Sequence, residues 1–178
     1  MKRLLLILII AFVGCTDTLN DEESKSKTII LPSLPHLEWM TENLSGFGGT
    51  EIDGRWYYTW EEAMAAAEQL GDGWRLPTQK EFEQLCELGS TRVVWEGCWV
   101  GGNHASNHKG SLFLPATGTF EDTGKLTHVG AWGYYWSSSI LPHDRNSAWL
   151  LGIDSRGAYM GSATNRSRLN SVRLVRSV

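Results

Sequence analysis

Residues 57–78 read YYTWEEAMAAAEQLGDGWRLPT and predict where the helical structure of this chain is concentrated. Thr59 is placed to cap a helix over about 60–70, because Glu62 stands three residues later and completes a capping box. Gly71 then supplies the left-handed residue with which many helices end.

The end of the same stretch predicts a short buried strand followed by a second helix. Pro77 disfavours helical backbone for the residue before it, so the first helix cannot run on into the second. Thr78 and Glu81 repeat the capping box, and the second helix should cover about 79–88 with Phe82 on its apolar face.

Helical periodicity fades after Ser90, and short aromatic and apolar runs take over. The expected strands are 93–95, 98–100, 112–116, 133–139, 148–153 and 171–176. Two helices in the first half and short antiparallel strands with long loops in the second predict an α+β fold.

Alternation along the expected strands predicts which side chains point inward. In the last strand, Val172 and Leu174 should be buried and Arg173 should face solvent. Trp74 and Trp136 stand among apolar neighbours close to turn residues, so both rings should lie in the core.

Composition indicates one globular domain that does not bind nucleic acid. The 178 residues are 42% hydrophobic and 20% charged, which is ordinary for a folded domain. Nine Trp and nineteen Gly favour a loop-rich fold filled by aromatic rings. The net charge of −4 argues against general nucleic-acid binding, because the phosphate backbone demands a basic face.

The first residues have the pattern of a targeting segment. Two basic residues precede an apolar run from Leu4 to Val13, which is too short to span a bilayer comfortably. The run ends in Phe-Val-Gly-Cys at 12–15, which resembles a bacterial lipobox with Cys15 as the lipidated residue. The alternative is an ordinary secretory signal in which Cys15 is incidental.

The expected layout is a signal peptide over 1–14, a lipidated Cys15 with a polar tether over 15–35, and one domain over 36–178. The acidic cluster at 21–23 resembles the export signals of Bacteroidetes lipoproteins. We therefore expect a protein anchored to the outer membrane through lipid on Cys15 and facing the cell exterior.

Four ordered motifs carry a family resemblance. They are WRLPT at 74–78, LFLPATG at 112–118, GYYWSSS at 133–139 and SVRLVR at 171–176. Together they resemble the Fibrobacter succinogenes major paralogous (FISUMP) domain, found in surface proteins of Bacteroidetes and their relatives. That domain is similar to the C-type lectin-like fold, so the resemblance implies this fold for residues 36–176.

Calcium-dependent sugar binding is not expected, although some C-type lectins use it. Their Glu-Pro-Asn or Gln-Pro-Asp loops have only Leu-Pro-His-Asp at 141–144 as a counterpart here, and no Trp-Asn-Asp follows. His104 and His108 are four residues apart but lack an evident third zinc ligand. We expect no metal and no cofactor.

Cys86 and Cys98 form an even pair in an exported chain, so they are candidates for a disulfide. The alternative is two buried free thiols that pack as small apolar groups.

Ligand contacts are expected from the loops of the second half. These are 101–109, 119–130, 142–146 and 156–168, which are long, polar and punctuated by glycine. The candidate residues in them are Asn103, His104, Asn107, His108, Asp144, Arg145, Asn146, Tyr159 and Asn165.

The residues favour a binding or adhesion module over an enzyme, with a glycan or a protein as ligand. Ser137, Ser138 and Ser139 lack the Gly-x-Ser-x-Gly elbow and an evident His partner, so the triple serine should be structural. The alternative function is a structural or accessory subunit of a surface assembly, such as fimbriae or a polysaccharide-handling complex.

Overall fold

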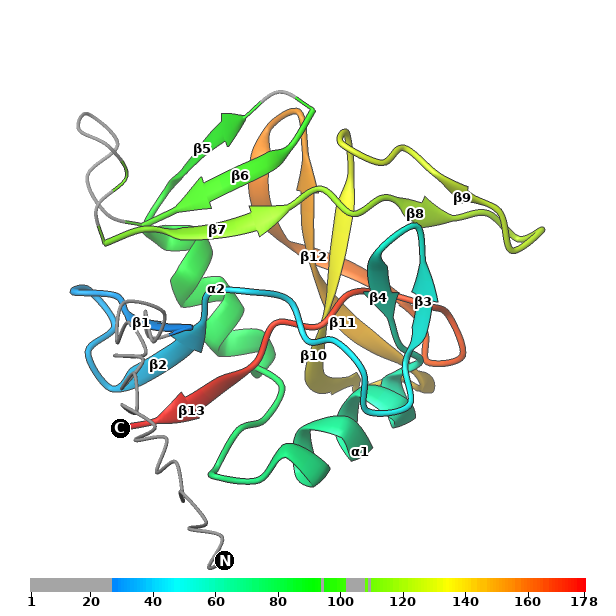
Figure 1. The fold of residues 1–178 in the computed structure, drawn as a ribbon, viewed down its shortest axis with the longest axis horizontal. Coiled ribbons are helices and arrows are strands. Elements are labelled where there is room, and N and C mark those ends of the chain that lie inside the picture. The colour runs from blue at the N-terminus through cyan, green and yellow to red at the C-terminus, as the bar shows by residue number, and fades with distance from the viewer. Residues whose placement is uncertain (1–26, 94, 102–107, 109) are drawn as a thin grey trace, which may run out of the picture.

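The computed structural model describes residues 27–93, 95–101, 108 and 110–178 (Figure 1). Within these residues the chain forms thirteen strands and two helices. The strands are β1 (Thr28–Ile30), β2 (Leu37–Met40), β3 (Thr50–Ile52), β4 (Arg55–Tyr57), β5 (Ser90–Val93), β6 (Gly97–Val100), β7 (Leu112–Pro115), β8 (Thr119–Phe120), β9 (Leu126–Thr127), β10 (Gly133–Leu141), β11 (Asp144–Asp154), β12 (Gly157–Asn165) and β13 (Val175–Ser177).

Both predicted helices are confirmed. α1 covers Trp60–Leu70 and α2 covers Gln79–Glu87, and each begins with a capping box. In α1 the Glu62 backbone N–H donates to Thr59 Oγ1 at 3.3 Å, and the Thr59 N–H donates to the Glu62 carboxylate at 2.8 Å. The same reciprocal pair joins Thr78 and Glu81 at the start of α2.

The predicted fold class, an α+β C-type lectin-like fold, is wrong. The described chain is mostly β, with five small sheets around the two helices. The physical reason lies in the second half, where β10, β11 and β12 have nine, eleven and nine residues and pair along most of their length. Residues expected to form short strands with long loops instead form one long antiparallel meander.

Two of the predicted loops are therefore strand and tight turn. The 156–168 loop is largely β12, whose residues pair with β11 from Ser147↔Asn165 to Asp154↔Gly157. The 142–146 loop is a turn in which Leu141 already pairs with Asp144. Of the other predicted loops, 119–130 contains the β8–β9 hairpin, and most of 101–109 lies outside the described residues.

The two ends of the described chain meet in one sheet of order β1-β2-β13 (Figure 1). β1 lies within the region expected to be tether, and it pairs with β2 from Thr28↔Met40 to Ile30↔Glu38. Leu31 and Leu34, which follow it, are 0% and 5% exposed and belong to the core. The packed domain thus begins at about Thr28 rather than at residue 36.

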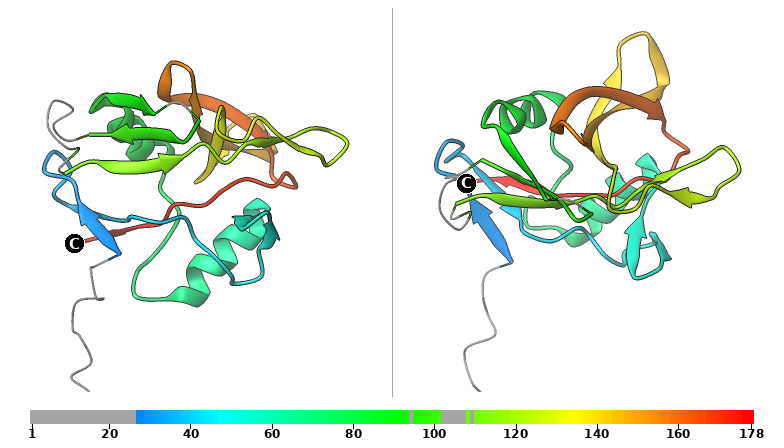
Figure 2. Two further views of the ribbon diagram at one scale, coloured as in Figure 1. Left: turned by 45° about the horizontal axis from the view of Figure 1, so that its top comes forward. Right: turned by 90° about the horizontal axis from the view of Figure 1, so that it is seen from above.

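Two apolar clusters form the core between the sheets and the helices (Figure 2). The first gathers around Trp39, Phe82 and Tyr135, and the second around Trp136 and the alanines of α1. Trp136 is 0% exposed, as predicted, and its indole N–H donates to the Tyr58 carbonyl at 2.7 Å. Trp74 is only partly buried and packs on the edge of the second cluster.

The expectation that Arg173 faces solvent is wrong, because its side chain is 0% exposed. Its guanidinium donates to the carbonyls of Met40, Thr41 and Phe113 at 2.9–3.1 Å and to Asn43 Oδ1. Those acceptors lie on segments that the sequence does not show to be neighbours. Arg173 therefore ties the chain after β2 to β7.

Within the described ranges, no helix has both the length and the apolar character needed to cross a bilayer.

Candidate binding site

Two of the predicted ligand residues meet at the end of the β10–β12 sheet. Asn146, near the start of β11, and Asn165, the last residue of β12, line one pocket of about 320 Å³. We call this the asparagine pocket, and its lining residues are Thr59, Glu61, Asn146, Asn165, Arg166 and Ser167. Strand pairing brings its two asparagines together, since Ser147 pairs with Asn165.

Arg166 is held in this pocket from several sides. Its guanidinium lies over the Trp60 ring at 4.2 Å, forms an ion pair with Glu61 and donates to the Arg145 carbonyl at 2.9 Å. Its Nε is buried and has no hydrogen-bond partner among the described residues. The pocket is therefore lined by a fixed cation beside two amide side chains.

Asp144 and Asn165 use their side-chain oxygens to shape the local backbone. Asp144 accepts hydrogen bonds from the Ser147 hydroxyl at 2.6 Å and the Asn146 N–H at 3.0 Å, and these bonds hold its pKa below the ordinary value. Asn165 Oδ1 accepts from the N–H of Ser167 at 2.9 Å and from its hydroxyl at 2.8 Å. Asp144 thus fixes the turn that presents Asn146 and Arg145.

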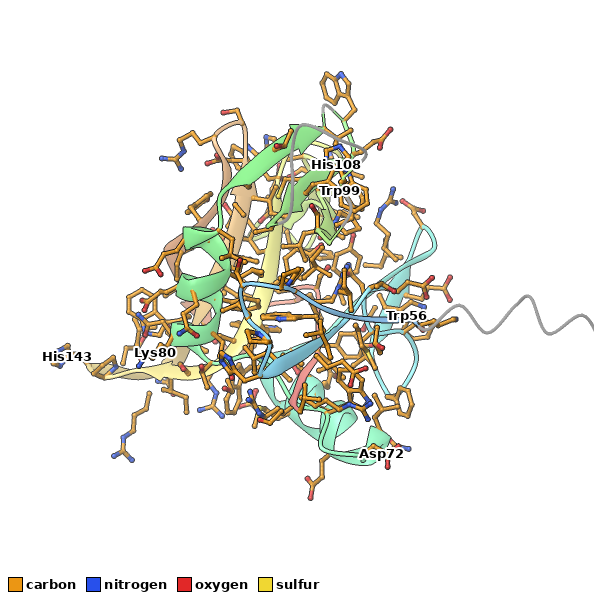
Figure 3. All side chains as sticks on the ribbon, turned by 90° about the vertical axis from the view of Figure 1, so that its left-hand side faces the viewer. Trp56, Asp72, Lys80, Trp99, His108 and His143 are labelled. Carbon is orange, nitrogen blue, oxygen red and sulfur yellow. The ribbon has the colours of Figure 1, made fainter. Side chains whose placement is uncertain are left out.

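Two more of the predicted ligand residues, His108 and Tyr159, lie outside this pocket. His108 stacks on Trp99 with ring centroids 4.8 Å apart and planes 7° apart (Figure 3). Tyr159 lies on β12, where Arg156 covers its ring at 4.8 Å and Tyr134 shares a hydrogen bond with it. Asn103, His104 and Asn107 lie outside the described residues. Of the predicted residues that the structure describes, His108 and Tyr159 are thus not part of the asparagine pocket.

Sequence reasoning missed Arg166, Arg168 and Asn170, which line the pockets on either side of the segment after β12. The local signal was an Arg-x-Arg pair in a region expected to be loop. Their partners stand 46 to 105 residues away, at Asp122 and Glu61, so no spacing pattern points to them.

The three adjacent serines serve the fold. The Ser137 carbonyl accepts from the Trp60 indole at 2.9 Å, Ser138 Oγ donates to the Pro77 carbonyl at 3.3 Å, and Ser139 Oγ accepts from the Gln79 N–H at 2.9 Å. These bonds join β10 to the start of both helices.

Cys86 and Cys98 are not joined by a disulfide, and both lie in the same core cluster. Cys98 is buried and Cys86 is partly buried, and this burial raises the pKa of the Cys86 thiol to about 12. A thiol with such a pKa carries little thiolate at neutral pH and reacts slowly.

A larger pocket of about 610 Å³ lies between the chain after β2 and the β3–β4 hairpin. Trp56, seen at the edge of that hairpin in Figure 3, lines it together with Asn43 and Arg55. Its charged lining is mixed, with Glu42 and Asp53 opposing the arginines, so it favours no ligand charge.

Two exposed aromatic side chains lie on neighbouring loops, Trp95 in the β5–β6 turn and Trp132 in the loop between β9 and β10. Trp95 is 75% exposed, and Trp132 is 39% exposed with His128 stacked on it at 4.1 Å. The loop that contains Gly130 packs closely against the β5–β6 turn. A Cβ built on Gly130 would lie only 2.7 Å from the Trp95 carbonyl oxygen, so this close approach requires glycine. We call Trp95, Val129 and Trp132 the aromatic tip.

The described part of the chain contains no group of three or more His, Cys, Asp or Glu side chains that could hold a metal ion.

Comparison with known proteins identifies the family of the chain. No curated protein and no solved structure matches it. One family model, that of the Lcl C-terminal domain, matches residues 29–176 and so runs from β1 to β13. This match covers most of the 178 residues. The chain therefore belongs to the Lcl C-terminal domain family.

Proposed function

We propose that this protein is a non-enzymatic binding module that takes a glycan or protein ligand at the asparagine pocket. The observation that carries the proposal is the convergence of Asn146 from β11, Asn165 from β12 and Arg166 from the turn after β12 onto one concave site. Amide and guanidinium groups recognise hydroxyl and carbonyl groups in fixed directions. The Trp60 ring and the Glu61 carboxylate hold the Arg166 guanidinium in place beside the two amides.

A binding role suits this site better than catalysis. The hydroxyl of Ser167, which lines the pocket, donates to Asn165 Oδ1 at 2.8 Å, and none of the described residues that line the pocket is a His. Nucleophilic catalysis needs a base beside the nucleophile. The carboxylate of Glu61 is already engaged by its ion pair with Arg166.

The proposed cellular location is the outer membrane, with lipid on Cys15 as the anchor and the domain facing the exterior. Its support is the lipobox-like Phe-Val-Gly-Cys at 12–15 and the acidic cluster at 21–23. The four motifs that resemble the FISUMP domain favour the same surface location. Multiple acyl chains would anchor the protein stably where one would not.

A glycan array tests the function with the full chain in a detergent that contains no sugar. We expect binding to at least one glycan, weakened about tenfold or more by Asn146→Ala or Asn165→Ala, since each removes an amide from the pocket. Arg145→Ala should weaken it less, because the Arg145 carbonyl rather than its side chain holds Arg166.

Glu68→Gln is the matched control, because Glu68 is exposed on the outer face of α1. It should bind like wild type, and all variants should melt within a degree or two of each other. Equal binding by the asparagine variants and the wild type would reject the site. A larger loss from Glu68→Gln would place the ligand on the helices instead.

A second candidate function is that of a structural or accessory subunit of a surface assembly. The aromatic tip favours it, because large exposed apolar side chains mark protein interaction sites. Cross-linking on intact cells should then capture a partner from wild type that Trp95→Ser loses. An unchanged cross-linking pattern would count against this role.

A further inference from the structure

A second pocket lies across the segment after β12 from the asparagine pocket. It has a volume of about 240 Å³ and is lined by the β8 end of a hairpin, the β10–β12 sheet and residues 168–170. In Figure 1 the β8–β9 hairpin lies to the right of the β10–β12 sheet, which occupies the middle of the view. The volume is below the roughly 300–1,000 Å³ of drug-sized sites, so it suits a single small ring rather than a chain.

Asn170 forms part of the wall of this pocket and holds an unused donor. The residue is 8% exposed, and its Nδ2 is buried with no hydrogen-bond partner in the part of the chain that the structure describes. The backbone cannot move away, because Asn170 and Tyr58 exchange hydrogen bonds at 2.9 and 3.0 Å. The terminal amide torsion is broad, so a rotation about it can bring the N–H to a ligand. Satisfying a buried donor favours binding.

A β-bulge shapes the wall opposite. Leu150 pairs with Ser162 and Leu151 with Met160, so Gly161 is the extra residue in β12. Gly161 has φ +125°, a value that favours glycine. Bulges turn side chains out of the regular alternation and occur next to binding sites. Here the bulge precedes Ser162, which lines the pocket together with Thr164.

The electrostatics of the pocket favour a neutral ligand. Arg168 is the charged residue in its lining, and its guanidinium is paired with Asp122 and donates to the Glu121 carbonyl at 3.1 Å. An anion would have to displace Asp122, and a cation would face Arg168. The remaining polar groups are hydroxyls and one amide, beside the rings of Phe120 and Tyr134.

We propose that this pocket binds one neutral polyhydroxy ring of monosaccharide size, with Asn170 and Ser162 as hydrogen-bonding residues. The ring hydroxyls match the Asn170 amide and the Ser162 and Thr164 hydroxyls, and its C–H face matches an aromatic ring. This proposal rests on the proposed binding function and gives its ligand a chemical class.

Saturation-transfer NMR on the full chain, in a sugar-free zwitterionic detergent, tests it. The probes are glucose, galactose, mannose and N-acetylglucosamine, with glucuronate and glucosamine as charged comparators. At least one neutral sugar should bind at millimolar concentration and more tightly than both charged sugars. Asn170→Ala and Ser162→Ala should each weaken it about fivefold or more.

The controls are Gln69→Ala, an exposed amide on α1, and Ser155→Ala, an exposed serine in the β11–β12 turn. Both should bind sugar like wild type. Ser162→Ala keeps the test decisive if Asn170→Ala fails to fold.

The outcomes separate this inference from the function on which it rests. Neutral sugars that bind wild type and both pocket variants equally would reject this pocket while a glycan function survives. No binding by any neutral sugar, with a positive glycan array or protein partner, would reject the inference and leave the function standing. Tighter binding of a charged sugar would reject the ligand class.

Discussion

Arg173 shows how much a single buried side chain can organise in this domain. Burial lowers the pKa of its guanidinium to about 10, yet the group remains charged at neutral pH. It is stabilised by the carbonyls of Met40, Thr41 and Phe113 and by Asn43. Because a buried charge is costly unless it is hydrogen-bonded, these acceptors and Arg173 depend on one another.

Arg173→Met should therefore lower the free energy of unfolding by about 3–5 kcal/mol, because it leaves several buried acceptors without a donor. Urea denaturation followed by tryptophan fluorescence measures the change. Arg145→Met is the control, since Arg145 is exposed and its loss should stay within about 0.5 kcal/mol. Similar urea midpoints for the two variants would contradict the structural role of Arg173.

Glu81, at the start of α2, makes the stability of the fold depend on pH. Burial by itself would raise its pKa, but hydrogen bonds from Arg75 at 2.7 and 2.8 Å and from the Thr78 N–H lower it below 4.5. A lowered carboxyl pKa stabilises the fold above the unfolded value, and this stabilisation is lost as pH falls through the folded pKa.

Glu81→Gln should thus be less stable than wild type by about 1 kcal/mol at pH 7, since partly exposed Arg75 is screened by solvent. The difference should be complete above about pH 5 and should shrink as the solution is acidified. Thermal melts at several pH values check this. A difference that stays constant down to pH 2 would mean that the charge of Glu81 is irrelevant.

At the scale of elements, the helices could be predicted because their signals are local. Thr59 with Glu62 and Thr78 with Glu81 are capping boxes within four residues, and both helix starts were correct to the residue. β12 was missed because it is an edge strand rich in Gly, Ala, Ser and Thr. Such a strand lacks a strong apolar face, so its pairing with β11 is decided by tertiary contacts.

The bulge in β12 should depend on the glycine at position 161. Gly161 takes φ +125°, which residues with a Cβ rarely adopt. Gly161→Ala should therefore cost about 1–3 kcal/mol of stability, although a Cβ there would meet no atom within 4 Å. Urea denaturation measures the loss. A loss of stability below about 0.5 kcal/mol would show that β12 can pair with β11 without the bulge at Gly161.

At the scale of the molecule, the candidate site could be predicted only in part. Asn146 and Asn165 were named from polar loop composition, but Thr59, Glu61 and Arg166 join them through long-range packing. Arg166 and Glu61 are 105 residues apart in sequence. Which polar residues converge depends on the β10–β12 meander, where the sequence predicted strands over 133–139 and 148–153 but loops over 142–146 and 156–168.

The start of the domain provides the last prediction. β1 pairs with β2, and the Leu31 and Leu34 side chains that follow it are 0% and 5% exposed in the first core cluster. Removing a buried leucine side chain typically costs about 2–5 kcal/mol. A chain that begins at His36 loses both leucines and also exposes one edge of β2.

A chain starting at Lys27 should match the stability of the full protein, because it keeps every contact described above. A chain starting at His36 should lose about 5 kcal/mol or more, which is comparable to the whole stability of an ordinary domain. Circular dichroism during heating would then show a cooperative transition for the longer chain and a weak or absent one for the shorter. Equal melting temperatures would mean that residues 28–35 act as tether after all, and that β13 alone is enough to hold β2 in the sheet.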